Sequence, residues 1–135
     1  PVSTGLSGLS AADLVVATAK STAGTGYATG AGGTVTQLTS KSTSVSLNKP
    51  CGQITTHNAS LAAATAVAFT FSNSTIAATD TVQFSVASGG TAGAYVVMAS
   101  GVSAGGCNVS IRNVTGGALA EALVLNFTVT NGVTS

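Results

Sequence analysis

Charged side chains are scarce in this chain, and their scarcity limits what the protein binds. Only 5% of the 135 residues are Asp, Glu, Lys or Arg, against roughly a quarter in an average soluble domain. Four Lys or Arg against three Asp or Glu give a formal net charge of +1, with no basic stripe to neutralise a row of phosphates. We therefore expect no direct nucleic-acid ligand.

Long apolar runs are also missing. No run approaches the ~18 apolar residues of a membrane span, and the first six residues lack the basic and apolar regions of a secretory signal. The leading Pro1 fits a chain whose initiator Met has been removed after synthesis in a cytoplasm, although a processed precursor would begin in the same way. The sequence predicts no membrane partner.

The supply of catalytic groups is equally small. Acid and base chemistry draws on His57, Asp13, Asp80 and Glu121 alone, and no Gly-x-Ser-x-Gly elbow or phosphate-loop Lys is present. We expect His57 to be a solvated loop side chain. The chain is therefore predicted not to be an enzyme, with no catalytic residue.

Cysteine is limited to two residues, Cys51 and Cys107. They are too far apart for a Cys-x-x-Cys motif, and a single His cannot complete a metal site with them. Cys107 is in phase with apolar neighbours, which predicts a small buried core residue, while a disulfide between the two remains an open alternative. No metal and no cofactor are expected.

What the chain does have is β-forming sequence. Thr and Val are abundant, and these residues pack well on a pleated surface. Short strand-like segments bounded by Gly, Asn, Ser or Pro recur after residue 33. The expected strands are 34–39, 43–48, 51–56, 64–72, 80–87, 93–100, 106–114 and 120–130.

Alternation of apolar and polar residues predicts which side chains face the core. It is clearest in three of these segments, and all four Phe fall in the inward set. The expected core residues are Val67, Phe69, Phe71, Val82, Phe84, Val86, Leu123, Leu125, Phe127 and Val129.

Eight short strands predict an all-β fold, and a jelly-roll β-sandwich of about eight antiparallel strands is our preferred architecture. An immunoglobulin-like sandwich is the alternative, but the chain has no Trp and neither Cys has the aromatic spacing of that core. We expect residues 1–30 to form an N-terminal arm and Gly-rich linker, and residues 31–135 to form the sandwich domain.

A nearly uncharged surface favours assembly, because charge repulsion does not keep copies apart. The apolar residues of the arm, and one Tyr whose hydroxyl needs a partner and tolerates the rim of an interface, are the expected partner-interface residues. They are Leu6, Leu9, Leu14, Val15, Val16 and Tyr27.

Five Asn-x-Ser/Thr sequons occur in the chain. Several would arise by chance in a sequence so rich in Asn and Thr, and the last lies inside a strand pattern, so they do not establish a secreted origin. The acceptor residues are Asn58, Asn73, Asn108, Asn113 and Asn126.

One stretch carries a family resemblance. It runs from Gly26 to Gln37, continues from Thr39 to Pro50, and ends with Gly52-Gln-Ile-Thr55. This segment and the arrangement of an arm before a sandwich resemble the capsid cementing, or decoration, proteins of tailed bacteriophages. The resemblance implies a jelly-roll homodimer on the exterior of an icosahedral head, made in the bacterial cytoplasm, that locks neighbouring major capsid protein subunits together. No catalytic residues carry over.

A carbohydrate- or receptor-binding module of a tail fibre or fimbrial tip is the alternative function, since it would use the same sandwich. Sugar recognition usually relies on exposed aromatic rings. The absence of Trp and the presence of only two Tyr weigh against it.

Overall fold

The computed structural model describes residues 26–135, and every statement about the structure refers to this part of the chain. This part contains eight strands and no helix. The strands are β1 (Gly32–Thr36), β2 (Val45–Ser46), β3 (Cys51–Thr55), β4 (Ala66–Ser72), β5 (Thr81–Ser88), β6 (Tyr95–Ser103), β7 (Gly106–Asn113) and β8 (Val124–Thr130).

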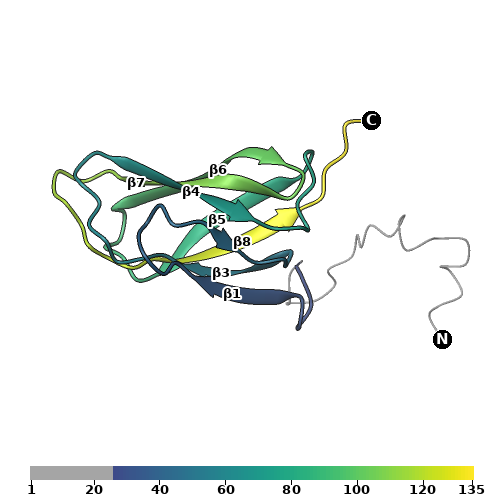
Figure 1. The fold of residues 1–135 in the computed structure, drawn as a ribbon, viewed down its shortest axis with the longest axis horizontal. Coiled ribbons are helices and arrows are strands. Elements are labelled where there is room, and N and C mark those ends of the chain that lie inside the picture. The colour runs from purple at the N-terminus through teal and green to yellow at the C-terminus, as the bar shows by residue number, and fades with distance from the viewer. Residues whose placement is uncertain (1–25) are drawn as a thin grey trace, which may run out of the picture.

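The strands form two four-stranded sheets that lie over each other as two layers (Figure 1). One sheet has the order β1-β3-β8-β5, and the other has the order β2-β4-β7-β6. We call them the β8 sheet and the β7 sheet. Each of the eight expected segments overlaps one strand, although the segment 43–48 keeps only two residues in β2.

Both sheets are mixed, so the expectation of antiparallel strands throughout is wrong. β1 pairs in parallel with β3, and β2 pairs in parallel with β4, whereas the remaining neighbours are antiparallel. Parallel neighbours need a crossover connection. Here the chain alternates between the sheets from β1 to β4, so each parallel pair is joined through a strand of the opposite sheet.

The core lies between the two sheets and centres on three phenylalanine rings. Phe71 of β4 meets Phe127 of β8 edge to face, with ring centroids 4.9 Å apart and an interplanar angle of 69°. Phe84 of β5 lies 6.1 Å from Phe127 and 6.2 Å from Phe71. Burying each ring is worth about 1.5–3 kcal/mol, and each edge-to-face pair adds about 0.5–1.5 kcal/mol.

Further apolar side chains extend this core along the strands and from the loops at both ends. Val67 and Phe84 are half-buried and pack against it. The buried members are Val45, Ile54, Leu61, Phe69, Phe71, Ile76, Val82, Cys107, Val109, Ile111, Leu123, Leu125, Phe127 and Val129.

Val86 departs from the expected core. Alternation places it on the inner face of β5, and it pairs in register with the fully buried Leu125. Its side chain is nevertheless 41% exposed. The sandwich is open at this end of β5, where the register shifts between Val86 and Ser88, so being in phase with the core does not bury the residue.

The parallel pairing of β1 with β3 depends on a glycine. Gly52 pairs with Gly33 and has a φ of +152°. A Cβ at position 52 would come 2.1 Å from the carbonyl oxygen of Gly33, which is backbone and has no side chain to move aside. Only a residue without a side chain lets β1 approach β3 here.

We predict that Gly52→Ala displaces β1 from the sheet edge and lowers the free energy of unfolding by about 1–3 kcal/mol. Gly116→Ala is the matched control, because a Cβ there meets nothing within 4 Å. Urea unfolding of both variants measures the difference. Equal stability of the two variants would contradict the role of Gly52.

Candidate functional site

Few of the charged side chains in residues 26–135 are free on the surface. Lys41 and Asp80 are buried, and the carboxylate of Glu121 is held by hydrogen bonds within the chain. Only Lys49 and Arg112 are exposed cations in this part of the chain. The sandwich therefore presents an almost neutral surface to solvent or to a partner.

Lys41 joins three loops at one end of the sandwich. Its Nζ donates to the carbonyl oxygens of His57 and, at 2.5 Å, of Glu121. Burial lowers the pKa of the Lys41 ammonium, and the charge of Glu121 partly opposes this. Gln37 supports the same cluster, donating to the carbonyls of Lys41 and Thr43 and accepting from the main-chain nitrogen of His57. The cluster is structural, since its hydrogen bonds go to main-chain groups.

The two carboxylates expected in the β domain hold separate loops. Asp80 accepts from the main-chain nitrogens of Ala77 and Gly132, and it thereby ties the start of β5 to the chain after β8. Glu121 lies before β8 and holds the turn between β5 and β6. Their hydrogen bonds thus go to different loops.

Glu121 receives three hydrogen bonds from the segment that it holds. The donors are the hydroxyl and main-chain nitrogen of Thr91, at 2.7 and 3.0 Å, and the hydroxyl of Tyr95, at 2.8 Å. The hydrogen bonds from Thr91, and to a smaller extent the one from Tyr95, lower the pKa of Glu121. Burial, followed by the bond to Glu121 and its charge, raises the pKa of Tyr95 to about 12. Both groups keep their ordinary charge near neutral pH.

Two of the five sequon asparagines are internal clamps. Asn73 follows β4 and Asn113 ends β7, and both are completely buried. In each, Oδ1 accepts from the main-chain nitrogen and the hydroxyl of the Thr two residues on, which are Thr75 and Thr115. The Asn-x-Thr pattern here is thus a turn motif rather than a glycan acceptor. Sequence reasoning saw the pattern but missed this role.

The amide of Asn113 also closes a loop. Its Nδ2 donates to the carbonyls of Leu61, Ala62 and Gly117, at 3.1, 3.2 and 2.8 Å. In residues 26–135 no buried side-chain nitrogen or oxygen lacks a hydrogen-bond partner. Here the uncharged amide of Asn113 links loops that ion pairs link in more highly charged domains.

Both outer faces of the sandwich are lined by small neutral side chains. On the β8 sheet, Gln53 donates to Asn126 at 2.9 Å across neighbouring strands. Arg112 is the one charged strand residue that points outward from the β7 sheet in the described chain. The outward residues of the central strands are Asn126, Thr128 and Thr130 on the β8 face, and Ala66, Ala68, Thr70, Asn108, Ser110 and Arg112 on the β7 face.

The long strands β5 and β6 are edge strands. Each pairs with one neighbour within residues 26–135, so one side of its main chain has no partner strand there. Neither strand contains a charged residue or Pro, which are common protections of an exposed edge. Val96 and Met98 of β6 are 45% and 55% exposed, so this edge also presents apolar surface.

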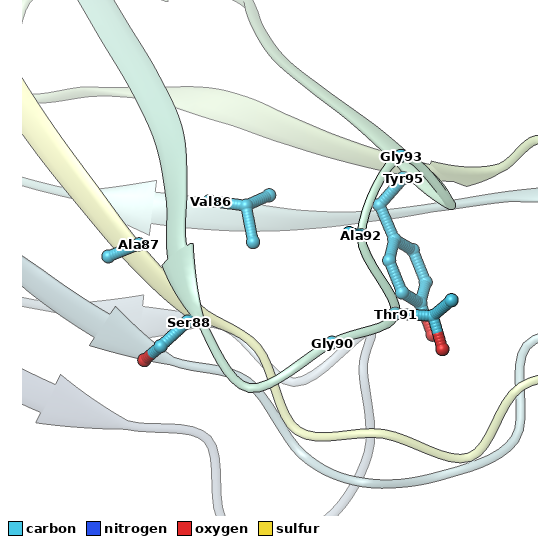
Figure 2. A pocket seen from close by; sticks show the side chains of 8 residues that line it. All are labelled: Val86, Ala87, Ser88, Gly90, Thr91, Ala92, Gly93 and Tyr95. Atoms are coloured by element: carbon cyan, nitrogen blue, oxygen red, sulfur yellow. The ribbon is translucent and has the colours of Figure 1, made fainter.

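A hollow of about 340 Å³ lies where β5 ends and β6 begins. Figure 2 shows Val86 pointing into it from β5, with Ala92, Thr91 and Tyr95 on the other side. Its remaining wall comes from Ala87, Ser88, Gly90 and Gly93. The hollow is thus lined by small apolar side chains, hydroxyl groups, one aromatic ring and main chain.

The residues expected at a partner interface are only partly described. Leu6, Leu9, Leu14, Val15 and Val16 lie outside the described residues. Tyr27 is described and is 47% exposed, and its hydroxyl donates to the carbonyl oxygen of Val129 in β8. Its hydroxyl is therefore bound within the chain, while part of its ring stays accessible.

The cysteines lie in different sheets, and both are free thiols. Cys107 is buried in the core, and burial raises the pKa of its thiol. Within residues 26–135, no three His, Cys, Asp or Glu side chains gather as a metal site would require. The same residues contain no helix long and apolar enough to cross a membrane.

We predict that Asn113→Asp lowers the free energy of unfolding by about 3–5 kcal/mol, because a buried carboxylate would face three carbonyl oxygens. Asn108→Asp on the exposed face of the same strand is the matched control and should change stability by less than about 0.5 kcal/mol. Thermal and urea unfolding measure both. A comparable loss of unfolding free energy in the two variants would contradict the role of Asn113 in closing the loop.

Comparison of the chain with protein-family models, with curated proteins and with solved structures finds no match in any of the three.

Proposed function

We propose that this chain is a structural virion protein that binds the exterior of an icosahedral phage head, as a homodimer, and cements neighbouring major capsid protein subunits. The observation that carries the proposal is the near absence of charge on the two outer sheet faces. An ordinary free domain has charged side chains there, whereas a face that is covered in an assembly does not need them.

The described side chains support a binding role and not a chemical one. Asp80 and Glu121, two of the four groups that sequence analysis singled out, are committed to loop structure by their hydrogen bonds, and so is Lys41. What remains accessible is extended, neutral sheet surface and two edge strands. Such surfaces suit contacts with other subunits, by face packing or by strand addition.

Dimerisation would strengthen attachment without a large interface on either copy. A dimer that touches two capsid subunits makes its second contact at a high effective concentration, so moderate contacts combine into tight attachment. The neutral faces of two copies also meet without like-charge repulsion.

We further propose that the sandwich is a jelly roll extended by parallel edge strands. The antiparallel pairs β3–β8 and β4–β7 are nested in the sequence and lie in different sheets. This is the pairing that results when a long hairpin is rolled into a sandwich. β1 and β2 then add in parallel at the outer edges.

A carbohydrate- or receptor-binding module is the alternative, and the hollow beside Tyr95 is the feature that it would use. The Tyr95 hydroxyl is already bound to Glu121, and a single ring offers little stacking surface for a sugar. We therefore favour the cementing role.

The proposal is tested by adding the purified protein to phage heads that lack it. We expect saturable binding and an increase in the temperature at which the heads release DNA. Ala68→Glu on the β7 face and Thr128→Glu on the β8 face each put a charge on a neutral surface. At least one of them should weaken binding tenfold or more, a change of about 1.4 kcal/mol.

The matched control is Thr134→Glu, which adds the same charge to an exposed residue beyond the last strand. Circular dichroism checks that all three variants stay folded. Failure of the wild-type chain to bind heads, combined with saturable binding to a glycan, would replace the proposal with the alternative.

A further inference from the structure

Asn131 is followed directly by Gly132, and the chain contains an Asn-Gly pair only here. In such a pair the main-chain nitrogen of Gly attacks the side-chain amide carbon of Asn readily, because Gly has no side chain to shield its nitrogen. The new C–N bond closes a succinimide ring and releases ammonia, and water then opens the ring to aspartate or isoaspartate. Asn131 is exposed and lies just after β8, so this deamidation is the reaction to which its side chain is open.

The fold requires glycine at position 132. A Cβ there would lie 2.1 Å from the carbonyl oxygen of Thr79, which belongs to the main chain just before β5. The chain after β8 therefore passes the start of β5 at a distance that excludes any larger residue. The residue that this packing requires is thus also the one that leaves Asn131 most open to cyclisation.

Both main-chain groups of Gly132 are held by the loop before β5. Its N–H donates to Oδ1 of Asp80 at 3.1 Å, and its carbonyl oxygen accepts from the hydroxyl of Thr79 at 2.7 Å. Asp80 is itself fixed, because its Oδ2 accepts from the main-chain nitrogen of Ala77 at 2.9 Å. The Asp80 side chain is buried, so water competes little for its oxygens. We call the two hydrogen bonds of Gly132 the Gly132 tie.

The Gly132 tie opposes both events that cyclisation needs. The nitrogen of Gly132 has to lose its proton, and the adjacent carboxylate of Asp80 disfavours a second negative charge beside it. The same nitrogen has to turn toward the side chain of Asn131, and the hydrogen bonds of the tie hold it in another direction. Reaction therefore requires that the tie opens first.

We propose that Asn131 is a deamidation site that the Gly132 tie protects in the folded chain. The reaction proceeds from the fraction of molecules in which the tie is open, so its rate follows local opening at the end of β8. Isoaspartate makes the opening permanent, because it inserts the side-chain methylene of residue 131 into the main chain before Gly132. The new carboxylate also adds a negative charge near that of Asp80, which opposes closure.

This inference goes beyond the proposed function, because it concerns a reaction of the chain with water and involves no phage head. It also gives Asp80 and Thr79 a chemical role in addition to joining the start of β5 to the chain after β8.

Peptide mass spectrometry of the full-length chain, incubated at mildly alkaline pH, measures the deamidation of Asn131. The folded wild type should react at least about tenfold more slowly than the chain unfolded in guanidinium chloride. Asp80→Ala removes the acceptor of the Gly132 N–H and should react at least about tenfold faster than the folded wild type. Thr79→Val removes only a hydroxyl group from an exposed residue and should accelerate the reaction by a smaller factor.

Ile111→Ala is the control for a general loss of stability, because it removes buried atoms from β7 in the other sheet and leaves the Gly132 tie intact. Its deamidation rate should stay within about twofold of the wild-type rate. Circular dichroism checks that the variants are folded, and Thr79→Val alone decides if Asp80→Ala is unfolded. Equal acceleration in Ile111→Ala, or an unchanged or lower rate in the folded tie variants, would overturn the proposal.

Hydrogen exchange at the Gly132 amide gives a second readout, because exchange needs the same opening of the tie. Asp80→Ala should accelerate exchange at this amide by a factor similar to that for deamidation. Unchanged exchange at Gly132 in a variant that deamidates faster would also contradict protection by the tie.

Discussion

The contact between the inner faces of the two sheets, through Phe71 and Phe127, is the interaction on which the other features depend. Each ring comes from the second or central strand of its sheet, and the edge-to-face contact fixes how the layers face each other. Once the layers are fixed, alternation along each strand sends every second side chain outward. The character of the two outer faces therefore follows from the same pattern that builds the core.

The domain achieves this packing with very few charges, and main-chain hydrogen bonding takes their place. The side-chain amides of Asn113, Asn73 and Gln37 donate hydrogen bonds that close loops. The ammonium group of Lys41 donates to two main-chain carbonyl oxygens. Apart from Lys49 and Arg112, the charged side chains of residues 26–135 are bonded within the chain. The outward residues of the central strands are mostly Thr, Ser, Asn and Ala, which is the basis of the proposed role in an assembly.

The sequence predicted much of the fold, because its alternation is regular. The segments around Phe69, Val82 and Leu125 became β4, β5 and β8, and their inward residues are mostly buried. The parallel edges were not predictable, since alternation gives no strand direction and the Gly52–Gly33 approach is visible only in three dimensions. The burial of Val86 was mispredicted for a related reason. Periodicity shows which face of the strand a residue lies on, but not whether other residues cover that face at that point.

The candidate site was less predictable than the fold. The clamp at Asn113 was visible as a sequon, but choosing between a turn and a glycan acceptor needs the burial of its amide. The cluster at Lys41 left no signal, since its partners are main-chain oxygens distant in the sequence. Neutral faces, in contrast, follow directly from the low charge content.

In the proposed assembly, neutral sheet faces make the contacts without ion pairs. This is tested by the dependence of dimer and head affinity on ionic strength, measured by sedimentation from about 0.01 M to about 1 M salt, where the Debye length falls from ~30 Å to ~3 Å. We expect both dissociation constants to change by less than about threefold. A weakening of tenfold or more as salt rises would show that charged contacts hold the assembly together and would contradict it.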